Sequence, residues 1–114
     1  MRRLLIVLLT LAGASLAQAH HGWNAYDSEQ PLTVETEIRD VSYRNPHAEL
    51  TVNHDDQDWR VILAPLSRLA SRGLPESDLQ PGSTVTIVGY PRKDGTPELR
   101  AERIIVEDRT IELR

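Results

Sequence analysis

Three histidines have the side chains and positions to bind a metal ion. His20 and His21 follow the small-x-small sequence Ala17-Gln18-Ala19, and His47 lies near the middle of the chain. If a peptidase cuts after Ala19, His20 becomes the first residue, and its α-amine and imidazole can close a chelate ring on one ion. A second imidazole would complete a three-nitrogen set, and such tetragonal ligation favours Cu(II). We therefore predict a metal site at the processed N-terminus, with copper as the metal.

Two histidines are the main candidates for the second imidazole. His21 is adjacent to His20 and needs no fold to reach the same ion. His47 follows the stiff Asn45-Pro46 and is predicted on the solvent side of a strand, whereas His54 lies beside Asp55 in a turn and is predicted to be solvated. The ligand pattern resembles the histidine brace of lytic polysaccharide monooxygenases and periplasmic copper-resistance carriers. That resemblance concerns the ligands alone and not the folds, and only His20 corresponds to it directly.

Residues 1–19 have the features of a secretory signal peptide. Arg2 and Arg3 form a charged start, residues 4–11 are almost wholly apolar, and small residues lead to Ala19. The apolar run is shorter than the roughly 20 residues that a membrane-spanning helix needs. We expect cleavage between Ala19 and His20, a periplasmic or secreted location, and no membrane attachment after cleavage.

The composition of the mature chain excludes several classes of function. Without Arg2 and Arg3, the 13 basic residues become 11 against 17 acidic residues, so the net charge is about −6 with histidines neutral. Nucleic-acid binding requires a basic surface, and this balance argues against it. The chain contains neither cysteine nor phenylalanine. The predicted core is therefore aliphatic and holds no disulfide, and no thiolate is present to bind a metal.

Alternating apolar residues predict a mainly β domain over residues 32–114, preceded by an arm over residues 20–31 without clear periodicity. In the first strand the apolar phase slips between Ile38 and Val41, which predicts a β-bulge. A short helix is predicted after Pro65, with Leu66, Leu69 and Ala70 on one face and Gly73 ending it. The predicted strands occupy residues 32–43, 47–53, 59–63, 84–88 and 99–106, and residues 110–113 either add an edge strand or trail.

This order of three strands, a helix and two strands resembles the OB-fold, a small Greek-key barrel. We expect five or six strands with one short helix between the third and fourth, and a small sandwich is the alternative. The arm must fold back to bring His20 to His47. Its 12 residues span at most about 40 Å, while a straight first strand would lead away by about 43 Å. A strand that curls around a barrel shortens this gap.

The chain also resembles a family of small exported bacterial proteins with no assigned function. The resemblance rests on His20-His21-Gly22-Trp23 with Tyr26-Asp27, on Tyr43-Arg44-Asn45-Pro46-His47, on Leu63-Ala64-Pro65 and on Pro81-Gly82-Ser83-Thr84-Val85. It would cover nearly all of the mature chain. It implies a compartment and a size, but it supplies no chemistry.

A second hypothesis assigns binding to two loops and no metal to the protein. In OB-folds the loops after the first and fourth strands flank the ligand face. Here they carry Arg44 and Asn45, and Arg92 and Lys93. These residues could bind a small anionic ligand or a periplasmic protein partner, although short polar loops commonly carry such charges without a ligand. Trp23 and Tyr26 are expected to anchor the arm to the barrel, which would also fix His20.

Enzymatic activity is not expected from the sequence. It contains no recognisable serine-histidine-acid arrangement, no glycine-rich phosphate loop and no evident pair of catalytic carboxylates. The acidic residues Glu98 and Glu102 are predicted to lie on solvated faces. Copper with open positions could activate oxygen, so oxidative chemistry is the one enzymatic alternative. The favoured function is a periplasmic metal carrier, buffer or sensor.

Overall fold

One long strand, β1 (Leu32–Ser42), organises the domain in the computed structural model, which describes residues 22–114. Residues 32–37 of β1 pair with β4, and residues 38–42 pair with β2. The register against β2 shifts between Ile38 and Asp40, where the apolar phase of the sequence slips. The predicted β-bulge is confirmed. It lets one strand serve two neighbours and curve around the barrel.

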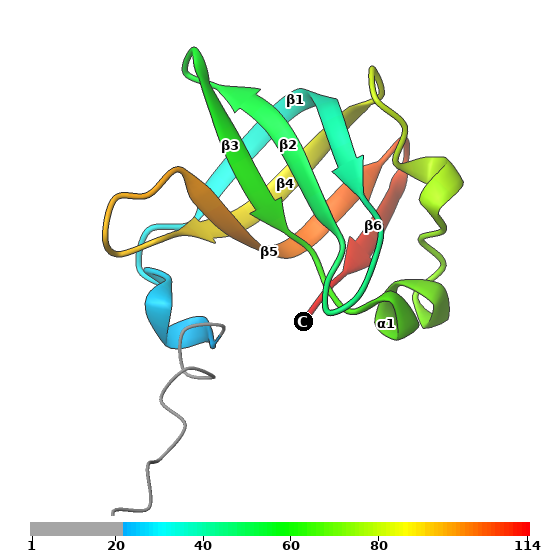
Figure 1. Ribbon diagram of the computed structural model, residues 1–114, viewed down its shortest axis with the longest axis horizontal. Coiled ribbons are helices and arrows are strands. Elements are labelled where there is room, and N and C mark those ends of the chain that lie inside the picture. Colours follow the sequence, from blue (N-terminus) through cyan, green and yellow to red (C-terminus); the bar gives the residue numbers. More distant parts are fainter. Residues whose placement is uncertain (1–21) are drawn as a thin grey trace, which may run out of the picture.

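The other strands close on β1 in the order of an OB-like barrel (Figure 1). The sheet order is β3-β2-β1-β4-β5-β6, and a parallel pairing of β3 with β5 completes a five-stranded barrel, to which β6 adds an edge strand. The prediction of a mainly β, OB-like barrel with one short helix between the third and fourth strands is confirmed. The remaining elements are η2 (Trp23–Ala25), β2 (Glu49–His54), β3 (Gln57–Ile62), α1 (Leu66–Ser71), η3 (Glu76–Asp78), β4 (Thr84–Pro91), β5 (Glu98–Val106) and β6 (Arg109–Glu112).

The core of the barrel is aliphatic, as the composition predicts. Its buried members are contributed by all six strands, by α1 and by the connectors around α1. Among the described residues, Tyr26 is the one aromatic side chain that is buried, at 5 % exposure. The largest fully buried side chains are those of Ile38, Leu50, Leu63, Leu69, Leu74, Leu79, Ile87, Leu99, Ile104 and Leu113.

Two details of the predicted elements were wrong. His47 was predicted on the second strand, but β2 begins at Glu49, because Pro46 has no N–H for a ladder and the last pair with β1 joins Ser42 to Glu49. In α1, Leu69 is buried as predicted, whereas Ala70 is exposed. Gly73 does end this helix, with a positive φ of 79°.

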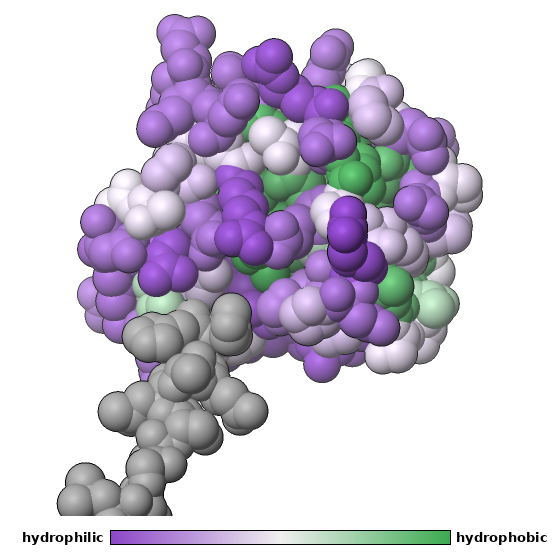
Figure 2. Space-filling model, in the orientation of Figure 1, coloured by the Kyte–Doolittle hydropathy of each residue, from purple (hydrophilic) through white to green (hydrophobic). Residues whose placement is uncertain are grey.

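The described surface is mostly hydrophilic. Figure 2 shows hydrophilic residues over most of one face, with hydrophobic residues visible between them. Within residues 22–114 the longest helix, α1, has 6 residues and cannot cross a bilayer.

Candidate functional site

A cavity of about 260 Å³ lies at one end of the barrel, between the arm, the β1–β2 loop, the end of β3 and the starts of β2 and β5. We call it the arginine cavity. Its walls combine three guanidinium groups, two carboxylates, an imidazole and a phenol with two apolar side chains. The lining residues are Tyr26, Pro46, His47, Glu49, Arg60, Ile62, Arg92, Glu98 and Arg100.

Glu98 is the centre of the hydrogen-bond network in this cavity. Its side chain is only 9 % exposed, and its carboxylate accepts from three side chains. The Tyr26 hydroxyl donates to Oε2 at 2.6 Å, Arg92 Nη1 donates to Oε2 at 3.2 Å, and Arg60 Nη1 donates to Oε1 at 3.4 Å. Arg60 also binds the Glu49 carboxylate in a two-pronged ion pair. The network therefore joins β2, β3, β5, the arm and the β4–β5 loop.

The arm buries the start of β5. Asp27 N donates to the Pro91 carbonyl at 2.8 Å, and Lys93 N donates to the Ala25 carbonyl at 3.0 Å. Tyr26 forms an isolated antiparallel bridge with Arg92. The arm therefore lies along the β4–β5 hairpin and is joined to it by one isolated β-bridge. Because it covers the outer face of β5, residues 98–101 are all buried.

Trp23 holds the beginning of the described arm against the barrel. Its ring meets Tyr90 edge to face, with the ring centroids 6.0 Å apart. The guanidinium carbon of Arg100 lies 4.9 Å from the Trp23 centroid, and that of Arg114 lies at 4.4 Å. Each cation–π contact of this kind contributes about 0.5–2 kcal/mol. Both predicted anchors, Trp23 and Tyr26, thus contact the barrel.

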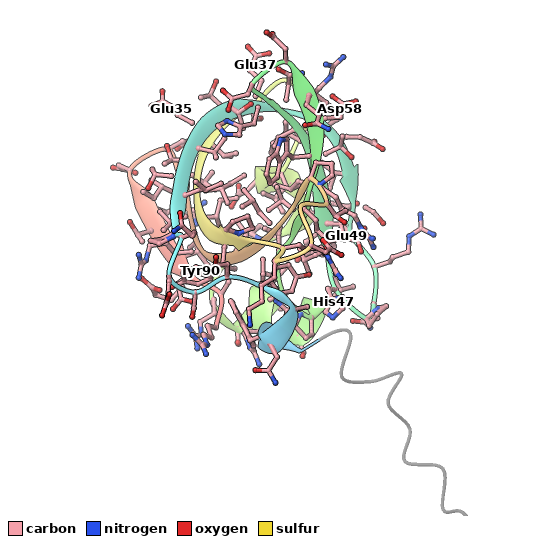
Figure 3. All side chains as sticks on the ribbon, turned by 90° about the vertical axis from the view of Figure 1, so that its left-hand side faces the viewer. Glu35, Glu37, His47, Glu49, Asp58 and Tyr90 are labelled. Atoms are coloured by element: carbon pink, nitrogen blue, oxygen red, sulfur yellow. The ribbon has the colours of Figure 1, made fainter. Side chains whose placement is uncertain are left out.

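His47 lies at the same end of the barrel as the arm. It follows the cis peptide bond between Asn45 and Pro46 and is partly buried. Figure 3 shows His47 next to Glu49 at this end, whereas Glu35, Glu37 and Asp58 lie at the opposite end. His47 and Tyr26 line one cavity although they come from the β1–β2 loop and the arm.

The loop residues singled out in the sequence have different places. Arg92 lines the arginine cavity, and its guanidinium also binds the Asp94 carboxylate at 3.3 Å. Lys93 lines a separate, smaller cavity beside Trp23. Arg44 Nε donates to the Ser42 hydroxyl at 3.1 Å, and Asn45 Oδ1 accepts from the Leu66 backbone N at 3.4 Å. Arg44 and Asn45 are not among the residues that line either cavity.

The predicted N-terminal ligands His20 and His21 lie outside the described residues. Residues 22–114 contain no group of three or more His, Asp or Glu side chains placed to hold a metal ion by themselves. His54 lies elsewhere, where its Nε2 is 3.4 Å from an Asp55 carboxylate oxygen and its ring meets Trp59 edge to face. Of the two histidines within residues 22–114, His47 is the one that the structure places beside the arm.

Sequence reasoning missed four charged members of the site. Glu98 was predicted to be solvated but is buried, and Glu49, Arg60 and Arg100 were not identified. Their strands alternate, so these side chains face outward from the barrel, which ordinarily means solvent. The signal that could have found them is the pair of large aromatic residues in the arm, because a ring that needs burial must cover an outer face of some strand.

Comparison with known proteins gives a family but no activity. Residues 7–99 match a family described as "Family of unknown function (DUF6152)". No curated protein matches the chain.

Proposed function

We propose, from the premise that the chain belongs to the DUF6152 family of unknown function, that the protein is a periplasmic transition-metal carrier, buffer or sensor. The metal, most simply Cu(II), would bind the α-amine and imidazole of His20 after removal of residues 1–19. His47 would provide the third nitrogen, with His21 as the alternative. Export is part of this proposal, because the α-amine of His20 exists only after cleavage behind Ala19.

The observation that supports the proposal is the position of Tyr26 beside His47 in one cavity. The reach of the arm was the main geometric obstacle, since a straight first strand would have carried the arm away from His47. The curved β1 and the arm along the β4–β5 hairpin remove this obstacle. Trp23 lies against Arg100, which itself lines the cavity, and three residues of extended chain from Trp23 back to His20 span at most about 10 Å, which supports placing His20 near the cavity.

The donor chemistry favours copper over harder cations. An amine and two imidazoles form an all-nitrogen set, which suits Cu(II), while Mg²⁺ and Ca²⁺ select oxygen ligands. The two carboxylates near His47 are already engaged, because Glu49 and Glu98 both bind Arg60. The nitrogen donors must be unprotonated to bind, so the affinity should fall as the pH drops below the ordinary pKa values of the amine and imidazole.

Calorimetric Cu(II) titration of a chain beginning at His20 tests the proposal. The comparison is the same chain with one alanine added before His20, which moves the amine away from the His20 imidazole. We expect the added residue to weaken binding by at least about 100-fold, or about 2.7 kcal/mol.

Histidine variants distinguish a metal site that includes His47 of the barrel from metal binding by the N-terminal residues alone. We expect His47→Ala to lower the affinity by about tenfold or more, and His54→Ala, which removes a histidine beside Asp55, to leave it unchanged within about twofold. Equal affinities of the native and extended N-termini would refute the chelate. A loss on extension without any effect of His47→Ala would assign the second imidazole to His21.

A further inference from the structure

We infer that Asp94 is a site of spontaneous isomerisation to isoaspartate, and that contacts from Thr96 and Arg92 suppress this reaction in the folded protein. Asp94 lies in the loop between β4 and β5 and is not among the residues that line the arginine cavity. The modification does not require the metal. It matters for the protein because the arm docks on this same loop.

The sequence Asp94-Gly95 has the chemistry that isomerisation needs, and it is the one Asp-Gly or Asn-Gly pair in the chain. The backbone nitrogen of Gly95 attacks the carboxyl carbon Cγ of Asp94, an N–Cγ bond forms, and one water leaves with a carboxyl oxygen. Water then opens the resulting succinimide ring at the former backbone carbonyl, so the chain continues through the side chain of residue 94. The water that is lost is regained, and no other reagent is consumed. Glycine favours the attack because it has no Cβ to obstruct it.

The loop leaves this pair accessible. The Asp94 side chain is 55 % exposed, and a Cβ placed on Gly95 would meet no atom of a non-adjacent residue within 4 Å. Gly95 N donates to the Arg92 carbonyl over 3.3 Å, which is long for an N–H···O bond. The attacking nitrogen is therefore neither shielded by neighbours nor held by a strong hydrogen bond.

The carboxylate of Asp94, in contrast, is held in its ionised form. Its Oδ1 accepts from Thr96 N at 2.9 Å, and both of its oxygens lie 3.3 Å from Arg92 Nε. Hydrogen bonds from the Thr96 backbone and side chain, followed by the one from Arg92, lower the pKa of Asp94 from 3.8 to about 2. An ionised carboxylate is a poor electrophile, because the oxygen that leaves must carry a proton. The lowered pKa makes the reactive, protonated form more than about tenfold rarer at pH 7.

The arm and Glu98 hold Arg92 in this position. Arg92 Nη1 donates to Glu98 at 3.2 Å, its guanidinium carbon lies 5.7 Å from the centroid of the Tyr26 ring, and Tyr26 forms a β-bridge with Arg92. Isomerisation would add one carbon to the backbone of the loop and displace the carboxylate from Thr96 N. The arm would then lose the loop geometry on which it docks. The folded contacts therefore protect the docking site of the arm from chemical ageing.

The experiment follows isoaspartate at residue 94 in the metal-free chain of residues 20–114, kept in EDTA at neutral pH. Peptide mapping by mass spectrometry measures the rate in the folded chain and in the same chain unfolded in urea. We expect isoaspartate to accumulate at residue 94 in urea, and to accumulate at least about tenfold more slowly in the folded chain. Gly95→Ala should slow the reaction in urea, because the added Cβ obstructs the attack.

Two variants test the contacts in the folded chain. Arg92→Gln and Thr96→Val should each accelerate isomerisation by at least about threefold, while circular dichroism verifies that the fold is native. Thr96→Val removes only an exposed hydroxyl, so it keeps the test decisive if Arg92→Gln impairs folding. Arg103→Gln is the matched control, because Arg103 pairs with Glu112 at 2.9 Å and does not contact the loop, and it should change the rate by less than about twofold.

Three results would overturn the inference. They are an unfolded chain that does not isomerise at residue 94, equal rates in the folded and unfolded chains, and folded variants of which neither reacts faster than the parent. None of these results bears on the Cu(II) chelate, because no metal is present.

Discussion

At the scale of single residues, the Tyr26 hydroxyl is the direct link between the arm and the charged network. Burial, followed by the hydrogen bond to Glu98 and its charge, raises the pKa of Tyr26 from 10.0 to about 12. The folded protein therefore holds the neutral phenol more strongly than the unfolded chain does. The resulting stabilisation is complete below pH 10 and is lost as the pH rises through about 12.

This link can be measured by replacing Tyr26 with phenylalanine. At pH 8 we expect Tyr26→Phe to lower the free energy of unfolding by about 2 kcal/mol, the usual contribution of a hydrogen bond to a charged group. The difference between parent and variant should shrink between pH 10 and pH 12, as followed by urea unfolding. Tyr90→Phe is the control for loss of a hydroxyl in a tyrosine that contacts Trp23. A difference that stays constant up to pH 12 would contradict the assigned hydrogen bond.

For single residues, the sequence identified members of the site that have unusual side-chain types, but it could not predict burial that depends on the fold. The types of Trp23, Tyr26 and His47 identified them, and the structure places all three around the arm. Glu98 could not be identified in this way, because an outward-facing glutamate on a strand is ordinarily solvated. Its burial depends on a segment more than 70 residues away in sequence, as the Tyr26 to Glu98 bond shows. Such a contact leaves no periodic pattern.

At the scale of elements, the bulge in β1 was the most predictable irregularity, whereas a second bulge, in β5, was not predicted. The phase slip in β1 predicted its bulge correctly. In β5 the register against β4 shifts beside Gly89, and the buried residues change from Leu99 and Ala101 to Ile104. A bulge changes which residues face inward, so it is visible in hydrophobic periodicity alone.

Gly89 shows why the second bulge requires a particular residue. A Cβ at this position would lie 2.6 Å from the Arg100 carbonyl oxygen, which is backbone and cannot move aside cheaply. We expect Gly89→Ala to destabilise the protein by about 3 kcal/mol through overpacking. Gly95→Ala is the matched control, because Gly95 has open space and only a positive φ of 83°, and it should cost about 1 kcal/mol. Thermal unfolding measures both, and equal losses would argue against the close approach.

The sequence did not decide whether residues 110–113 form a sixth strand. The contacts of β6 with neighbouring residues explain why it forms. The short β6 leaves one edge without a strand partner, and arginine side chains cover this edge. Arg68 Nη1 donates to the Leu113 carbonyl at 3.0 Å, and Arg72 Nη1 donates to the Glu112 carbonyl at 2.9 Å. Capped carbonyls and charged side chains discourage pairing with another chain. Arg68 lies in α1 and Arg72 is the C-cap of this helix, so local periodicity could not reveal these partners.

At the scale of the whole molecule, the proposed metal site depends on how firmly the arm is held. Trp23 contacts the barrel through Tyr90, Arg100 and Arg114, and this anchoring lowers the entropy lost when His20 meets His47. Trp23→Ala should therefore weaken Cu(II) binding in a chain beginning at His20, by about tenfold. The loss should be smaller than about twofold when His47 is already alanine.

A double-mutant cycle of Trp23→Ala and His47→Ala, measured by copper calorimetry, tests this coupling. Additive effects would mean that the arm does not position the amine relative to His47. The barrel should remain folded in all four chains, which circular dichroism can verify. The sequence predicted that Trp23 anchors the arm but not which residues it contacts. Two of its three partners are arginines, Arg100 and Arg114, which reach the Trp23 ring only once the barrel has closed.

The contact between Trp23 and Arg114 brings the arm close to the residues that follow β6, so a short linker could join these two parts in a circularly permuted chain. A chain that starts at Asp56, continues through Arg114 and a short linker to His20, and ends at Asp55 would break only the tight turn between β2 and β3. Every strand pairing and the arginine cavity would be preserved. The amine of His20 would become part of a peptide bond, so the rearranged chain should keep the charged network around Glu98 and lose the proposed chelation.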